Sequence, residues 1–160
     1  MMWSDVVALA LIAGVAWLES HRGFGRALFD LLGAIISVKV AAALAEPLGK
    51  AVPVFSAAGP NQAFWLTAAF VVLAVLTVIG SKLIYDTILL SLDVLDPLVG
   101  GLLGFASGLV VAHIFLKMMS LGYADSEAAK LLLSSFMGQE LLQFRAYHTV
   151  VTALQNLGKW

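Results

Sequence analysis

The sequence predicts an all-α polytopic membrane protein with about four transmembrane helices and an amphipathic helical tail. Hydrophobic residues make up 61% of the 160 residues, charged residues only 12%, and the mean hydropathy is +0.98. A soluble domain of this size needs more charge on its surface. Apolar stretches that approach the ~20 residues needed to cross a bilayer recur along the chain. Turn-forming and charged residues separate these stretches, and the length of 160 residues fits one domain.

The first apolar stretch covers about residues 2–18, and Ser4 or Asp5 can cap its start. No Lys or Arg precedes it, whereas basic residues follow it at Arg22 and Arg26. A secretory signal peptide has the opposite arrangement, with a basic region in front and a small-residue cleavage site behind. We therefore expect this stretch to be a retained transmembrane helix.

The next two predicted spans cover about residues 27–45 and 63–83. Lys39 interrupts the second span, and Glu46-Pro47 is expected to end it because a residue before proline avoids helical angles. Turn formers fill the predicted loop 48–62. The fourth span is expected to start at Asp96-Pro97, with Asp as N-cap and Pro at the first helical position, and to continue to Leu116.

Two segments are amphipathic rather than spanning. Residues 86–95 mix two aspartates with leucine and isoleucine. Residues 126–157 place apolar side chains at helical spacing, and Gly138 is a candidate break; these side chains are Leu133, Met137, Leu141, Phe144 and Val151. Such helices lie in the headgroup region or dock on a bundle. The predicted domains are thus a transmembrane unit, 1–122, and a tail, 123–160.

The orientation is predicted from basic residues near the ends of the spans, because cytoplasmic loops carry more Lys and Arg. One side of the membrane receives Arg22, Arg26 and Lys82, and the other receives Lys50 and Lys117. This bias predicts a cytoplasmic 19–26 loop and both termini outside the cytoplasm. The same basic loop is either a membrane anchor or a patch for anionic headgroups or a partner.

Glycines recur every four residues in the fourth span, at Gly100, Gly104 and Gly108. On a helix they form one ridge, along which a second helix can approach backbone to backbone. The ridge packs either within one subunit or at a seam between copies of a homo-oligomer.

Lys39 is a charge inside an apolar helix, so it should face the bundle or water and have a partner. If the first two spans form an antiparallel hairpin, Asp5 and Lys39 lie equally far from the Arg22-Gly23 turn, at ~25 Å. His113 is expected at a similar depth, counted from Asp96. The predicted intramembrane cluster of Asp5, Lys39 and His113 is either a structural ion pair or a proton or ion site.

Residues typical of catalysis and metal binding lack the required spacing. The chain has no Cys, and its three His do not follow a metal-ligand spacing. Neither a nucleophile elbow nor a phosphate-binding loop is present. The net charge of −1 and the lack of a basic stripe do not suit nucleic acid. We therefore predict a protein that is not an enzyme, with no cofactor, no metal and no nucleic-acid partner.

The order of three motifs resembles the bacterial colicin V production protein family. These are Trp3-Ser4-Asp5 with Gly14, then Arg22-Gly23-Phe24 with Arg26-Ala27-Leu28, and then Asp96-Pro97-Leu98-Val99-Gly100 with Gly104 and Gly108. The resemblance covers about residues 5–116, in hydropathy only over 41–81, and it includes little of the tail. Lys39 departs from the family pattern.

The resemblance implies a four-helix protein of the bacterial inner membrane, linked to colicin V production or export and to envelope processes. Similar modules also precede extracytoplasmic protease domains, which agrees with an outside C-terminus. The favoured function is a non-enzymatic scaffold or accessory protein whose partners are the lipid bilayer and an envelope or secretion protein. The alternative is a small oligomeric channel or transporter subunit that uses Asp5, Lys39 and His113.

Overall fold

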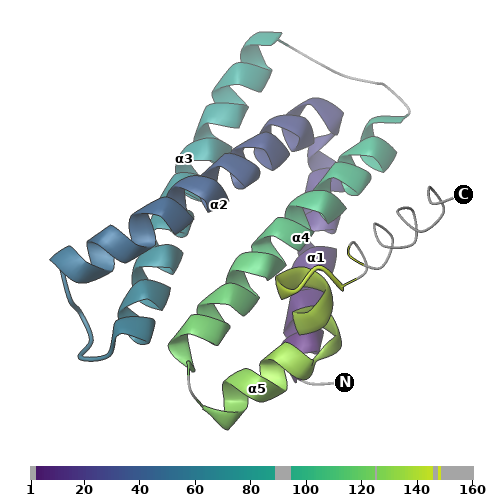
Figure 1. The fold of residues 1–160 in the computed structure, drawn as a ribbon. Coiled ribbons are helices and arrows are strands. Elements are labelled where there is room, and N and C mark those ends of the chain that lie inside the picture. The colour runs from purple at the N-terminus through teal and green to yellow at the C-terminus, as the bar shows by residue number, and fades with distance from the viewer. Residues whose placement is uncertain (1–2, 89–94, 125, 146–147, 149–160) are drawn as a thin grey trace, which may run out of the picture.

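The computed structural model describes residues 3–88, 95–124, 126–145 and 148, and the regular elements in this part of the chain are all helical (Figure 1). They are α1 (Trp3–Arg22), α2 (Phe24–Ala51), α3 (Ala58–Ile88), α4 (Asp96–Gly122), α5 (Glu127–Ser134) and a short π-helical segment, η2 (Gly138–Leu142). The all-α prediction is confirmed.

Helices α1 to α4 are each long and apolar enough to cross a membrane, as predicted. At ~1.5 Å per residue, the 20-residue α1 matches a hydrocarbon core of ~30 Å. The other three helices have 27–31 residues, so they must tilt or extend beyond the core. Their exposed faces are rich in leucine, isoleucine, valine and phenylalanine, as expected of surfaces that contact lipid.

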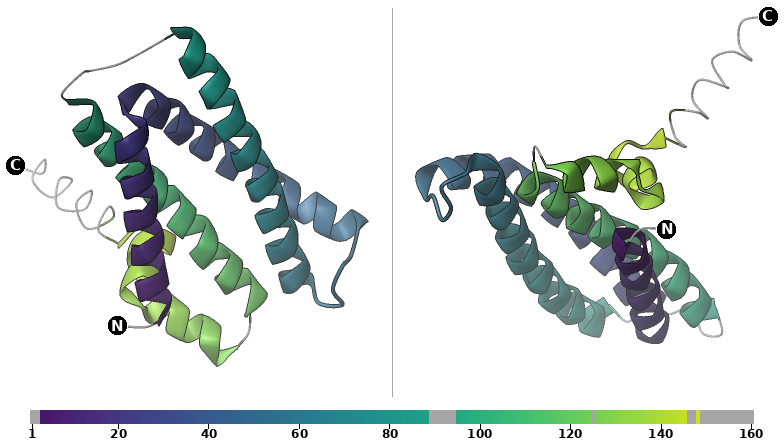
Figure 2. Two further views of the ribbon diagram at one scale, coloured as in Figure 1. Left: turned by 180° about the vertical axis from the view of Figure 1, so that it is seen from behind. Right: turned by 90° about the horizontal axis from the view of Figure 1, so that it is seen from below.

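The helices do not pack in sequence order. Helix α1 lies mainly on α4, α2 lies mainly on α3, and α4 also contacts α2 and α3. Helices α1 and α2 diverge from their common turn and share little contact (Figure 2). The predicted antiparallel hairpin of the first two spans is therefore wrong as a packing unit, although its turn is in the predicted place.

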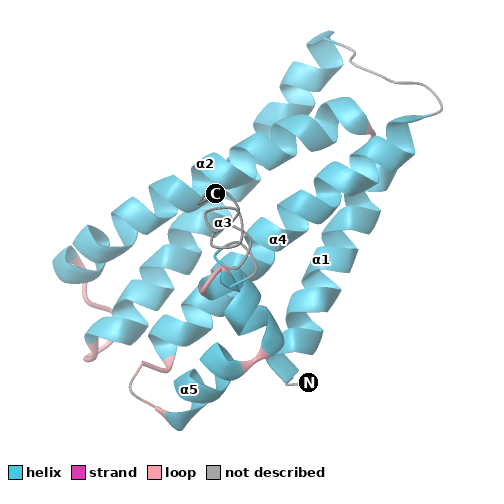
Figure 3. Ribbon diagram, turned by 45° about the vertical axis from the view of Figure 1, so that its right-hand side comes forward, coloured by secondary structure: helices cyan, strands magenta, loops and turns pink. Residues whose placement is uncertain are grey.

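Two apolar cores result from this arrangement, and α4 contributes to both. The first joins α1 and α4 to the tail, and the second joins α2, α3 and α4. The first core contains Ala8, Ile12, Ala112, Leu116, Leu132 and Met137, and the second contains Ala41, Ala45, Leu66, Phe70 and Ile114. Helix α4 is thus the central helix of the bundle (Figure 3).

Pro47, which was expected to end the second span, and Pro60, which falls in the predicted loop 48–62, both lie inside helices instead. Helix α2 continues through Pro47 to Ala51, and α3 begins at Ala58, before Pro60. Pro47 lies in the last turns of α2, where the Val52 N–H still bonds Leu48 O at 2.9 Å. Pro60 lies in the first turn of α3, where the missing N–H has no intrahelical partner to lose. Proline is tolerated at these ends, so the spans are longer than predicted.

The tail is broken rather than one continuous helix. Helix α5 is capped at its start by Ser126, whose hydroxyl accepts a hydrogen bond from Ala129 N at 3.3 Å, and it ends before Ser135, which is extended. Leu132 and Met137 are buried in the first core, so residues 126–145 dock on the bundle. Val151 and residues 89–94 of the predicted amphipathic segment 86–95 lie outside the described residues, and α3 takes in Asp86 to Ile88.

Candidate functional site

The turn between α1 and α2 is fixed by a glycine and an aspartate that are far apart in sequence. Gly23 has φ +83°, a left-handed conformation that strains residues with a side chain. A Cβ at this position would lie 2.5 Å from Asp96 Oδ2. Asp96 Oδ1 accepts a hydrogen bond from Phe24 N at 3.0 Å. Asp96 therefore accepts a hydrogen bond from a backbone N–H in the first turn of α2. The N-cap of its own helix α4 is Leu95, so the prediction of Asp96 as N-cap is wrong.

The glycine ridge on α4 receives α1 of the same chain. A Cβ at Gly100 would lie 2.7 Å from Glu19 O, and a Cβ at Gly108 would lie 2.7 Å from the Cα of Ile12. At Gly104 the corresponding distance to Glu19 Cβ is 2.6 Å. The ridge thus packs within one subunit, the first of the two predicted alternatives. A homo-oligomer remains a prediction, and it would need a different surface.

An ionic cluster lies beside this turn and joins α1, α2 and α3. Arg22 Nη1 donates hydrogen bonds to Glu19 Oε1 at 2.8 Å and to Asp30 Oδ2 at 3.2 Å. Ser81 on α3 donates a hydrogen bond to the other oxygen of Asp30. Glu19 is only 4% exposed and Asp30 only 7%. Two buried carboxylates therefore share one guanidinium, which suits the cost of an unpaired charge inside a membrane protein.

Sequence reasoning found Arg22 but not its partners. Asp30 stands inside the predicted span 27–45, and Glu19 ends the first span, so both were visible as charges at the edge of apolar segments. Their proximity depends on the turn at Gly23, and Ser81 is 51 residues from Asp30. A cavity of about 200 Å³ adjoins the cluster, and Ser107 on α4 is among the residues that line it.

Asp5 joins α1 to the tail. It is 2% exposed, and its Oδ1 accepts a hydrogen bond from Met137 N at 3.0 Å. The ion pairs among the described residues connect Arg22 with Glu19 and Asp30, Lys50 with Glu46, and Lys130 with Glu127. The predicted pair of Asp5 and Lys39 is not among them. Its premise was a hairpin of α1 and α2, whereas α1 lies on α4.

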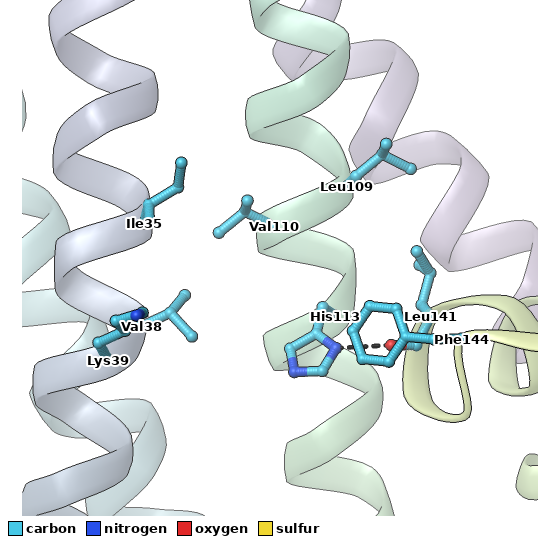
Figure 4. A pocket seen from close by; sticks show the side chains of 8 residues that line it. All are labelled: Ile35, Val38, Lys39, Leu109, Val110, His113, Leu141 and Phe144. Carbon is cyan, nitrogen blue, oxygen red and sulfur yellow. Dashed lines mark hydrogen bonds between the residues drawn. The ribbon is translucent and has the colours of Figure 1, made fainter. Parts of the chain in front are cut away.

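Lys39 and His113 both line a groove between α2 and α4 (Figure 4). The groove has a volume of about 290 Å³, and its other walls are Ile35, Val38, Leu109, Val110, Leu141 and Phe144. His113 Nδ1 donates a hydrogen bond to Leu141 O at 2.8 Å, because a carbonyl oxygen can only accept. The ring of Phe144 lies 6.0 Å from that of His113. Two of the three predicted cluster residues therefore share a site.

Gly14 is the family-motif residue for which the structure gives no packing reason. It is exposed on α1, and a Cβ there would meet nothing within 4 Å. By contrast, Gly23, Asp96 and the ridge glycines all contribute to the contact of α1 with α4. Within the described part of the chain, no three His, Asp or Glu side chains gather as a metal-binding group would require.

The fold and these contacts define a multi-pass α-helical membrane protein whose four spans are held by an ionic turn, a glycine ridge and a docked tail. The chain belongs to the colicin V production protein family, since the model of that family matches residues 4–143. The match includes α5 and η2, beyond the limit of about residue 116 that the sequence resemblance suggested. Comparisons with curated proteins and with solved structures gave no match.

Proposed function

We propose that this protein is a non-enzymatic scaffold or accessory protein of the bacterial inner membrane that acts in colicin V production, through secretion of the toxin or the envelope processes on which it depends. The single observation that carries this proposal is the family match over residues 4–143. Family membership supports a role in colicin V production. The matched region coincides with the whole described bundle, including the tail that docks on it.

The contacts of the motif residues favour a scaffold protein over a channel or transporter subunit. Gly23, Asp96 and Gly104 position helices relative to one another, and Asp5 positions the tail. The outer faces of the bundle remain apolar and exposed, so they are available to lipid and to helices of other membrane proteins. The alternative of a channel subunit depended on Asp5, Lys39 and His113 forming one polar cluster, whereas Asp5 bonds Met137 N and is not among the residues that line the groove of the other two.

The proposal is tested in cells that make colicin V. Deletion of the gene should lower the colicin V released into the medium, and the wild-type gene should restore it. Gly104→Leu, which should prevent α1 from docking on α4, should fail to restore it, whereas Gly14→Leu, at an open position, should succeed. Unchanged colicin V release in the deletion strain would contradict the proposed function. Ion conduction by the purified protein in liposomes would favour the channel instead.

A further inference from the structure

We propose that the groove carrying Lys39 binds a transmembrane helix of a partner protein that presents a carboxylate at the middle of its span. This inference rests on the proposed accessory function and names the chemistry of the partner. Three observations lead to it: the position of Lys39 near the middle of a membrane-spanning helix, its lack of a partner among the described residues, and the apolar walls of the groove.

Lys39 lies near the middle of α2. At ~1.5 Å per residue, it is about 22 Å from the Phe24 end and about 18 Å from the Ala51 end. Its side chain is exposed on the surface of the bundle and lines the groove. A lysine at the end of a span can extend its ammonium to the headgroups, but one in the middle of a 28-residue helix is poorly placed to do so.

The ammonium of Lys39 has neither an ion pair nor a hydrogen bond with any described residue. Three other charged side chains of the bundle, Glu19, Arg22 and Asp30, pair with one another at the α1–α2 turn. An isolated charge at bilayer depth is costly and is normally paired. The chain therefore leaves one cation at mid-span whose counter-charge must come from outside the described bundle.

The walls of the groove select the kind of molecule that brings this charge. Isoleucine, valine, leucine and phenylalanine side chains from α2, α4 and the tail line the groove together with Lys39 and His113 (Figure 4). Such a surface suits the apolar face of a helix rather than a hydrated ligand. His113 is held by its bond to Leu141 O, so the tail shapes one wall of the groove.

Depth favours a partner helix over a lipid headgroup. Headgroups lie at the edges of a hydrocarbon core of ~30 Å, about 15 Å from its centre. A carboxylate on a transmembrane helix is fixed at whatever depth its sequence position gives. Pairing with Lys39 would satisfy both charges, each of which is costly alone, and the flanking apolar side chains would cover exposed residues such as Ile35.

The test uses the cysteine-free chain with one added cysteine, Lys117→Cys, labelled with a donor fluorophore. The probe is a synthetic leucine–alanine transmembrane helix with a single central Asp and an acceptor label, reconstituted with the full-length protein in phosphatidylcholine vesicles. Matched probes carry Asn or Leu in place of Asp. We expect energy transfer from the Asp probe to half-saturate at about tenfold lower probe density than transfer from the Asn probe.

Three variants distinguish binding at the groove from general association of helices. Lys39→Met should abolish the preference for Asp over Asn and should still fold, because it removes a charge with no described partner. Lys50→Met, which removes an exposed lysine paired with Glu46 near the end of α2, should keep the preference. Lys39→Glu should switch the preference to a probe with a central Lys. The proposal is contradicted if wild type shows no preference for the Asp probe, or if the preference persists in Lys39→Met.

A lipid occupant is distinguished by adding phosphatidylglycerol. Displacement of the Asp probe by this lipid, in wild type and at low mole fraction, would assign the groove to a headgroup and overturn the proposal. The outcome is independent of the colicin V assay. If wild type shows no preference for the Asp probe but gene deletion still lowers colicin V release, only the partner-helix proposal is rejected. No effect of gene deletion on colicin V release rejects the proposed function.

Discussion

The two charged regions of this bundle differ in how their charges are satisfied. At the α1–α2 turn, Arg22 is shared by Glu19 and Asp30, and the network is closed by Ser81. At the groove, Lys39 lines an apolar surface together with His113, and it has no counter-charge among the described residues. In the first arrangement the charges are paired within the protein, as expected of a contact that stabilises the fold. The second leaves an interaction open to another molecule, so only the groove suggests recognition.

The largest effect in this comparison should come from removing the cation of the ionic cluster. Arg22→Met leaves two buried carboxylates without their shared partner and should lower the free energy of unfolding by about 3–5 kcal/mol. Adding Glu19→Gln and Asp30→Asn should recover part of the loss. Unfolding in detergent, followed by circular dichroism, measures both. Lys50→Met is the control, since its solvent-exposed ion pair with Glu46 should contribute little to stability.

A smaller effect is expected at the glycine ridge. Gly104→Leu should separate α1 from α4, because even a Cβ at this position would lie 2.9 Å from the Cα of Ala16. Overpacking of this kind costs about 1–3 kcal/mol or more. Gly14→Leu, on an open face of α1, and Leu103→Ala should both disturb thermal stability less than Gly104→Leu. An equal effect of Gly14→Leu and Gly104→Leu would show that the ridge is not a packing surface.

The next prediction concerns Asp5 and Lys39, which the structure separates. Asp5→Ala removes the acceptor of the Met137 N–H and should cost about 1–3 kcal/mol and loosen the tail. Lys39→Met should leave stability unchanged or slightly raised. The double variant should be additive within about 0.5 kcal/mol, as for independent sites. Recovery of stability in the double variant would instead indicate the direct pair that the sequence suggested.

The last prediction places the ionic turn relative to the two sides of the membrane and involves no change in stability. The excess of Arg22, Arg26 and Lys82 at the turn end predicts that this end is cytoplasmic and that both termini are outside. A C-terminal reporter that is active only in the cytoplasm should be silent, and the same reporter inserted in the 89–94 connection should be active. The reverse pattern would contradict the orientation.

The sequence by itself determined the local features of this protein. Long apolar stretches predicted four spans, because crossing a bilayer requires a continuous apolar helix. Gly23 predicted the turn, and the spacing of Gly100, Gly104 and Gly108 predicted a packing ridge, because these depend on backbone sterics within one segment. The order of the same residues was sufficient to suggest the family that the match over 4–143 assigns.

Only the tertiary structure decided which helices meet. Lipid is as apolar as the helix faces, so hydropathy does not determine whether α1 packs on α2 or on α4. Because α1 packs on α4, Asp5 accepts a hydrogen bond from Met137 N instead of pairing with Lys39. At the other end of α1, Asp96 of α4 accepts a hydrogen bond from Phe24 N of α2. The packing of α2 on α3 brings Ser81 to Asp30 across 51 residues. Which distant backbones approach each other and which distant charges pair are properties of the assembled bundle, and for this reason no single segment reveals them.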